Sequence, residues 1–320
     1  MTSETQPAPA TAPVRAPDAA PRRGSLARAM RRRDARVAAA MLLPAAILGL
    51  VFMLYPIAST FWMSLNQVNQ FGQTRAFVGL GNYTRLLADS GFQQAFWRTL
   101  IWTVSVVGIT TISSLFLAAV LDRRFRGRVV ARGLLLLPWA ASLVVSTLLW
   151  RWMSNPDFGA LNGVLEAFGV DMNRLNWLAK PNTALPLMIW IGIWASIPPT
   201  TLMLLAGHQT IDGNVSEAAA LDNGRGIRGY VDITLPLLRP VLAVSILLNV
   251  VFVFNSFPII WGLTEGGPAG QTDTLVTYLY KIGFKLYDMG GAAAVSVIMF
   301  LVLLVFAMIY TRLAWRNVLK

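Results

Sequence analysis

Apolar residues are concentrated in six long runs that are separated by more polar segments. Each run has about the 20 residues that an α-helix needs to cross the hydrocarbon core of a bilayer. None of the runs contains Asp, Glu, Lys or Arg, as is typical of helices surrounded by lipid. The pattern predicts an all-α membrane protein with six transmembrane helices. The predicted spans are residues 37–65, 99–121, 133–150, 184–206, 240–263 and 289–311.

The segment before the first span differs in composition. Residues 1–21 are rich in Pro, Ala and Thr, and residues 22–36 form a basic run. This composition predicts a disordered basic tail over residues 1–36 and a single membrane domain over residues 37–320. The first apolar run is about twice as long as the 7–15-residue core of a secretory signal peptide, and five more runs follow. We therefore expect the tail to stay attached.

The distribution of cations predicts the orientation. With six spans, the amino-terminal tail, the second and fourth loops and the carboxyl-terminal tail lie on one side, which holds 19 of the 27 Lys and Arg residues. The positive-inside rule then places both termini in the cytoplasm. The net charge of +12 therefore fits a membrane protein, and a soluble nucleic-acid binder would have to bury six uncharged runs. The second loop, 122–132, contributes Arg123, Arg124, Arg126, Arg128 and Arg132.

The sequence lacks the residues that nucleotide binding, metal binding and ion-coupled transport usually require. No segment matches the P-loop pattern, so we expect no nucleotide site, no catalysis and no cofactor in this chain. The single histidine, His208, and the lack of Cys leave no His pair or thiolate set for a metal. The spans also lack the Asp, Glu or His on which ion-coupled secondary transporters usually depend. That class is nevertheless kept as an alternative, together with a non-transporting membrane scaffold.

The fourth loop, residues 207–239, is long and patterned. Asn214 and Glu217 have the spacing of a helix-capping box, and Ala-rich residues follow. Asn223 and Gly224 tolerate the left-handed conformation in which helices often end. A second helical piece, 227–234, is expected to stop before Pro236. The loop thus predicts a helix-turn-helix on the cytoplasmic surface.

This loop resembles the EAA motif of the permeases of ABC importers. The similarity covers EAAALDNG at 217–224, ITLP at 233–236 and the Arg-Pro pair at 239–240. Asn223 departs from the family, which usually has Gly there. The resemblance implies a coupling helix that docks into an ATPase subunit, with small side chains that fit a narrow groove. The implied coupling residues are Glu217, Ala218, Ala219, Asp222, Asn223 and Gly224.

Further segments are similar to carbohydrate-importer permeases of the maltose type. They are FVGLGNY at 77–83, LPW at 137–139, NPDFG at 155–159, LTEGGP at 263–268 and the stretch 272–280. The resemblance implies a first-subunit-like permease of the bacterial inner membrane that pairs with a second, different permease. Two copies of an ABC ATPase, which bind ATP and Mg²⁺, and an extracytoplasmic solute-binding protein complete the implied assembly. No nucleic-acid partner is expected.

Polar and flat aromatic residues within the spans suggest a solute pathway. Amides and hydroxyls suit the hydroxyls of a sugar, tryptophan rings stack on sugar faces, and a helix broken at Pro198 and Pro199 would free carbonyls toward a cavity. Asn249 and Asn255 are spaced to share a helix face. The alternative is that the asparagines bridge helices at the heterodimer interface and the tryptophans anchor at the membrane surface. The candidate pathway residues are Trp139, Trp194, Ser196, Asn249, Asn255 and Ser256.

Within the importer class, a di- or oligosaccharide is the expected solute. A glycerol-3-phosphate-type or polyol importer is the nearest alternative. A phosphate favours an Arg or Lys partner, and the predicted spans contain neither.

Overall fold

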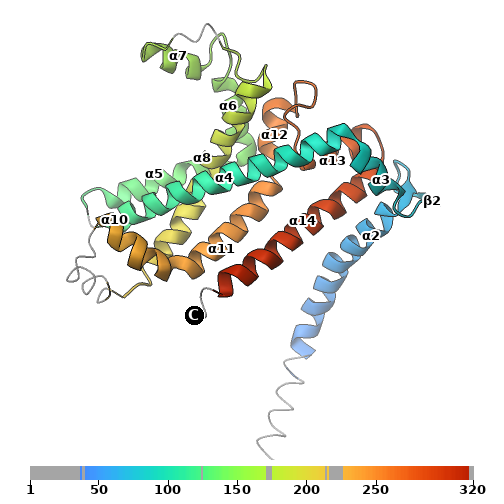
Figure 1. The fold of residues 1–320 in the computed structure, drawn as a ribbon, viewed down its shortest axis with the longest axis horizontal. Coiled ribbons are helices and arrows are strands. Elements are labelled where there is room, and N and C mark those ends of the chain that lie inside the picture. The colour runs from blue at the N-terminus through green and yellow to red at the C-terminus, as the bar shows by residue number, and fades with distance from the viewer. Residues whose placement is uncertain are drawn as a thin grey trace, which may run out of the picture. The chain divides into compact units, whose positions relative to one another are not determined.

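The computed structural model describes residues 37, 40–123, 125–170, 175–212, 215 and 226–316. The described residues divide into two compact units, one before Ser59 and one from Ser59 onwards. Nearly all regular structure is helical, which confirms the predicted fold class (Figure 1). The basic tail 1–36 lies outside the described residues, so its predicted disorder stays a prediction.

Five helical stretches among the described residues are long and apolar enough to cross a membrane. They match five of the six predicted spans: Ala40–Ser64, Ser90–Asp122, Pro181–His208, Gly226–Thr264 and Met289–Ala314. Two further helices, α5 (Arg128–Ala140) and α6 (Leu143–Met153), meet at a bend of 90° and give a sixth candidate span when they are counted together. The predicted span 133–150 is therefore divided between these two helices.

Proline explains this bend. Pro138 lies in the last turn of α5, where its ring lacks the N–H that would bond the carbonyl of Leu134. Ala141 and Ser142 then adopt extended backbone angles, and α6 starts in a new direction.

The fifth span is also interrupted. Helix α11 (Leu235–Phe254) ends at Asn255 and Ser256, and α12 (Phe257–Thr264) follows. Pro258 lies in the first turn of α12 and offers no N–H to the carbonyl of Phe254. Two of the six spans therefore carry a break that the apolar pattern alone did not reveal.

Two other proline sites do not break their helices. The predicted break at Pro198 and Pro199 is wrong, because α8 (Pro181–His208) is helical throughout. Two hydroxyl groups donate to backbone carbonyls beside the proline pair. Thr200 Oγ1 donates to the Ser196 carbonyl at 2.7 Å, and Ser114 Oγ donates to the Ile197 carbonyl at 3.4 Å. Thr200 lies on α8 itself and Ser114 on the neighbouring helix α4, whereas the carbonyls that lose their N–H partners to the two prolines are those of Trp194 and Ala195.

The predicted stop before Pro236 is wrong too. The chain is helical from α10 (Gly226–Gly229) through the π-helix η2 (Tyr230–Thr234) into α11. The wider π turn moves the hydrogen-bond pairing away from Pro236, since the Leu235 N–H bonds the Tyr230 carbonyl five residues back. The π-helix η1 (Leu50–Leu54) likewise ends two residues before a proline, Pro56, within the helix that continues as α2 (Tyr55–Ser64).

The core lies where α4 (Ser90–Asp122), α8, α11 and α12 meet. Figure 1 shows α4 running beside α8, and these two helices pack together along most of their length. Gly192 of α8 permits this approach, because a Cβ there would lie 2.7 Å from the Trp102 ring of α4. Close packing over small residues is how helices associate in membranes.

Smaller elements connect the spans. An antiparallel hairpin, β1 (Asn66–Val68) with β2 (Thr74–Phe77), and α3 (Gly81–Ala88) follow α2. Helix α7 (Ala160–Ala167) lies between the third and fourth spans. Helix α13 (Leu275–Tyr280) and the π-helix η3 (Lys281–Lys285) precede α14 (Met289–Arg316). The hairpin is the one departure from an all-α architecture in the described chain, and the sequence did not predict it.

Candidate functional site

The two predicted pathway tryptophans have different surroundings. Trp139, at the end of α5, is 62% exposed. Trp194 of α8 is half-buried and meets Trp150 of α6 edge to face, with ring centroids 5.7 Å apart. The structure therefore ties Trp194 to the bent third span and leaves Trp139 on the protein surface.

Ser196 and Asn249 are brought together through Thr200. The amide of Asn249 on α11 donates to Thr200 Oγ1 on α8 at 3.4 Å, and Thr200 Oγ1 donates to the Ser196 carbonyl at 2.7 Å. All three residues are buried. A polar connection between the fourth and fifth spans thus runs through the apolar core.

Asn255 and Ser256 form the break between α11 and α12. Asn255 is exposed, and its amide donates to the Val251 carbonyl of the preceding turn at 2.8 Å. Ser256 is buried. Because Asn249 is buried and Asn255 is not, the two amides do not share one face as the spacing suggested.

Several buried hydroxyls in the described spans have no hydrogen-bond partner. Such a group normally finds one, since burying it unpaired costs on the order of 1–3 kcal/mol. Two of them, on Ser146 and Ser256, lie next to the two helix breaks. The others are on Thr103, Thr110 and Thr111 of α4 and on Thr201 of α8. These hydroxyls have unused capacity for water or for a solute hydroxyl.

Trp102 supports the break in the fifth span. Its side chain is 1% exposed, and its indole Nε1 donates to the Val253 carbonyl at 2.9 Å. Val253 lies in the final turn of α11, and its carbonyl also accepts from the Ser256 N–H at 3.1 Å. Trp102 therefore caps α11 from the neighbouring helix α4.

The two helices beyond the breaks, α6 and α12, pack on each other. A Cβ on Gly262 of α12 would lie 2.7 Å from Thr147 Cγ2 of α6. The Arg151 guanidinium also donates to the Gly262 carbonyl at 3.4 Å. The interrupted third and fifth spans thus meet through their short helices.

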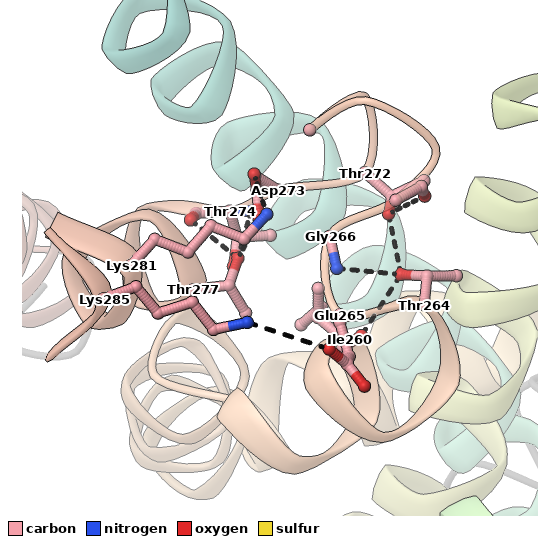
Figure 2. Close-up of polar contacts among 12 residues, drawn as sticks. Ile260, Thr264, Glu265, Gly266, Thr272, Asp273, Thr274, Thr277, Lys281 and Lys285 are labelled. Carbon is pink, nitrogen blue, oxygen red and sulfur yellow. Dashed lines mark hydrogen bonds and ion pairs between the residues drawn. The ribbon is translucent and has the colours of Figure 1, made fainter.

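The loop between α12 and α13 has a dense polar core, which Figure 2 shows. The hydroxyls of Thr264 and Thr272 lie 2.7 Å apart, and Thr272 Oγ1 donates to the Gly267 carbonyl at 2.7 Å. The Gly266 N–H bonds Thr264 Oγ1 at 3.2 Å. This loop carries the LTEGGP sequence, and its own side chains fix its shape.

Asp273 anchors the same loop. Its carboxylate is buried and accepts from Lys281 Nζ at 2.7 Å and from Thr277 Oγ1 at 2.9 Å (Figure 2). Gly266 has a positive φ of 80°, and a Cβ at this position would collide with the Asp273 carboxylate. Glycine is therefore required here for both backbone and packing reasons.

The loop and α13 are also attached to α4. Arg98 Nη1 donates to the Gly270 carbonyl at 2.8 Å, and the Leu275 N–H bonds Thr99 Oγ1 at 2.8 Å. Burial, together with a hydrogen bond to Asp89, raises the pKa of Tyr278 above its ordinary value, so its hydroxyl stays protonated. The start of α4 and the loop therefore form one ordered region.

The predicted coupling residues lie outside the described residues. They are Glu217, Ala218, Ala219, Asp222, Asn223 and Gly224. Both flanks of this segment are described: α8 ends at His208 and α10 begins at Gly226. Residues from these flanks and from α4 line a cavity of about 810 Å³.

Comparison with known proteins identifies the family. Residues 111–318 match the model of the binding-protein-dependent transport system inner membrane component. The chain belongs to this family. As a member, this permease is a multi-pass protein of the inner membrane, and its family is not one of enzymes.

Relatives match this permease over nearly its whole length. A probable ABC transporter permease of Brucella suis is 43% identical over 87% of this chain and 96% of its own. The trehalose/maltose transport system permease MalF of Thermococcus litoralis is 35% identical over 88% of this chain and 94% of its own. The sn-glycerol-3-phosphate permease UgpA of Yersinia enterocolitica is 33% identical over 87% and 94%.

A solved structure has the same fold. A chain from a bacterial alginate ABC transporter, in complex with an alginate pentasaccharide-bound periplasmic protein, superposes with a TM-score of 0.77 at 23% identity. The match covers 89% of this permease and 96% of that chain.

Sequence reasoning missed four residues with defined structural roles. Trp102 carried a signal, because a tryptophan inside a span needs an acceptor for its indole N–H. Asp273 lies in a loop that was recognised only by resemblance, and Lys281 follows that segment as the first residue of η3. Nothing in the sequence around Tyr230 predicted its contact with His208, which is described below.

Proposed function

We propose that this permease is one of two different membrane subunits of an ATP-driven importer for a neutral di- or oligosaccharide. An extracytoplasmic binding protein delivers the solute, and two copies of an ABC ATPase supply the energy. The observation that carries this proposal is the end-to-end similarity to a permease whose name states trehalose and maltose transport. ATP and Mg²⁺ belong to the partner ATPase in this scheme, and the chain itself holds no cofactor.

The polar groups of the spans support a neutral solute. Ser146, Asn255 and Ser256 lie at or near the two helix breaks and carry no charge. A sugar hydroxyl both donates and accepts hydrogen bonds, as these amides and hydroxyls do. The pathway proposal therefore keeps Trp139, Trp194, Ser196, Asn249, Asn255 and Ser256.

A glycerol-3-phosphate-type solute is the second candidate, because the match to UgpA is nearly as long and as close. A phosphate is usually met by Arg or Lys. The two arginines in α4 and α6 are already engaged: Arg98 donates to the Gly270 carbonyl and Arg151 to the Gly262 carbonyl. Because both arginines already donate to backbone carbonyls, a neutral sugar is favoured over glycerol-3-phosphate as the solute.

The coupling loop is the proposed contact with the ATPase. Glu217 offers one charge to a basic partner, and Ala218 and Ala219 suit a narrow groove. The excess of arginine on one side supports a cytoplasmic location for this loop and for both termini. Replacing Glu217 by Lys, or Ala218 by a bulky residue, is expected to release or uncouple the ATPase while the spans remain inserted.

Transport in reconstituted vesicles tests the function. The permease is purified with the partners that accompany it, and uptake of labelled maltose is measured with and without ATP and binding protein. We expect uptake to require both and to be inhibited by unlabelled neutral sugars. Preferential inhibition by glycerol-3-phosphate would favour the second candidate. Uptake by this chain alone, without nucleotide, would contradict an ATP-driven importer and support an ion-coupled transporter.

A further inference from the structure

Two aromatic rings meet at the ends of the helices that flank the proposed coupling loop. His208 is the last residue of α8, and Tyr230 is the first residue of η2. Their rings are stacked, with centroids 5.6 Å apart and planes inclined by 20°. His208 Nε2 and the Tyr230 hydroxyl also lie 3.2 Å apart, at hydrogen-bond distance. The two flanks of the loop are therefore joined directly, although the residues are 22 positions apart in the sequence.

The same tyrosine reaches a third helix. Its hydroxyl donates to the Leu115 carbonyl of α4 at 3.4 Å. Its own carbonyl accepts the wide π-type bond from the Leu235 N–H, so Tyr230 is also fixed to the start of α11. One side chain and its backbone thus connect α4, α8 and α11 at the same end of the bundle.

The packing around this contact is close. Gly207 precedes His208, and a Cβ on Gly207 would lie 3.0 Å from Val241 Cγ1 and 3.1 Å from Leu238 Cδ2 on α11. Leu238 is 1% exposed. On this face the helices already touch, so a displacement of α8 toward α11 is passed on by direct contact. His208 and Tyr230 also line the cavity of 810 Å³ between the flanks of the loop and α4.

We propose that His208 and Tyr230 form a joint that passes movement of the coupling loop to α4, α8 and α11. The two residues are positioning residues, because they act through the helices and touch neither solute nor nucleotide. This inference rests on the proposed function, since it assigns a mechanical role to the flanks of the loop that docks on the ATPase.

Conservative variants test the joint in the assembled importer. Tyr230→Phe keeps the stacked ring and removes the hydroxyl that faces His208 Nε2 and the Leu115 carbonyl, and Tyr230→Ala removes the ring as well. Tyr310→Phe is the matched control, because Tyr310 stacks on Phe306 within a single helix, at a centroid distance of 5.4 Å. For each variant we measure co-purification of the ATPase, ATP hydrolysis, and labelled maltose taken up per ATP hydrolysed.

We expect Tyr230→Phe to lower the maltose taken up per ATP several-fold while the ATPase still co-purifies, and Tyr230→Ala to lower it further. Tyr310→Phe should leave the ratio unchanged. A purely structural role would reduce the amount of assembled complex and leave the ratio of the surviving complex as in the wild type, which would overturn the proposal. Should Tyr230→Ala fail to assemble, the ratio for Tyr230→Phe decides. If the wild-type importer shows no ATP-driven uptake, both the proposed function and the joint are overturned, whereas a normal ratio in both Tyr230 variants overturns the joint alone.

Discussion

The Trp102 indole nitrogen donates a hydrogen bond of 2.9 Å to the Val253 carbonyl, one residue before α11 ends. The bond links the second span to the point where the fifth span breaks. The Ser256 N–H bonds the same carbonyl at 3.1 Å, so a backbone donor and a side chain from another helix together satisfy the end of α11, where lipid supplies no donor.

Replacing Trp102 by Phe is expected to weaken this region. An aromatic ring remains, but the Val253 carbonyl loses one of its donors and keeps the Ser256 N–H, which costs about 0.5–1.5 kcal/mol. The melting temperature of the purified permease should fall, and uptake should fall with it. Replacing the exposed Trp97 of the same helix by Phe serves as the control, and an equal effect of the two variants would contradict the capping role.

Gly262→Ala is expected to push α6 and α12 apart. The new Cβ would meet Thr147 Cγ2 at 2.7 Å, and overpacking of this kind costs typically about 1–3 kcal/mol. Adding Thr147→Ser removes that methyl group and should restore stability and uptake. Gly108→Ala, also within a span but with no atom within 4 Å of the new Cβ, should be tolerated. Failure of the double variant to recover would contradict the packing account.

Asp273→Asn is expected to loosen the loop between α12 and α13. It leaves the partly buried Lys281 without its carboxylate, and breaking a buried pair costs about 3–5 kcal/mol. Asp273→Asn with Lys281→Met should be less harmful than Asp273→Asn alone. Limited proteolysis of residues 265–274 and thermal unfolding measure the effect.

The control for this pair is Glu265→Gln. Glu265 faces Lys285 at 3.9 Å, and both side chains are more than half exposed. Exposed pairs contribute at most about 1 kcal/mol, so this variant should resemble the wild type. Equal loop cleavage in Glu265→Gln and Asp273→Asn would refute the anchoring role of Asp273.

Asn249→Ala and Asn255→Ala separate a solute pathway from a subunit interface. If these amides meet the solute, both variants should assemble normally and show a higher concentration of sugar for half-maximal uptake. If they bridge the two permeases, less of the second permease should co-purify. Unchanged uptake with normal assembly would remove both residues from the pathway.

The sequence predicted the number and approximate place of the spans because lipid imposes a simple rule on their composition. Breaks were harder to predict, since a proline has different effects in different surroundings. Pro138 and Pro258 accompany interruptions, whereas Pro198 and Pro199 lie within a continuous α8. The difference comes from the packing of neighbouring helices, which a single sequence does not contain.

The candidate site was predicted unevenly for a similar reason. The polar residues of the spans were found, because an amide in an apolar run is conspicuous. Their grouping was not, since the link from Asn249 to Thr200 and the separation of Asn255 depend on how α8 and α11 pack. The motif residues 217–224 were recognised from their resemblance to the EAA motif and lie outside the described structure.

The π turn at Tyr230–Thr234 also sets the rotation of everything that follows it. One residue of an α-helix corresponds to about 100° around the axis, so a surplus residue turns the whole of α11 by roughly that angle relative to α10. Deleting a single residue there would leave the composition of the span almost intact, yet it would swing Asn249 away from α8 and carry lipid-facing side chains inward.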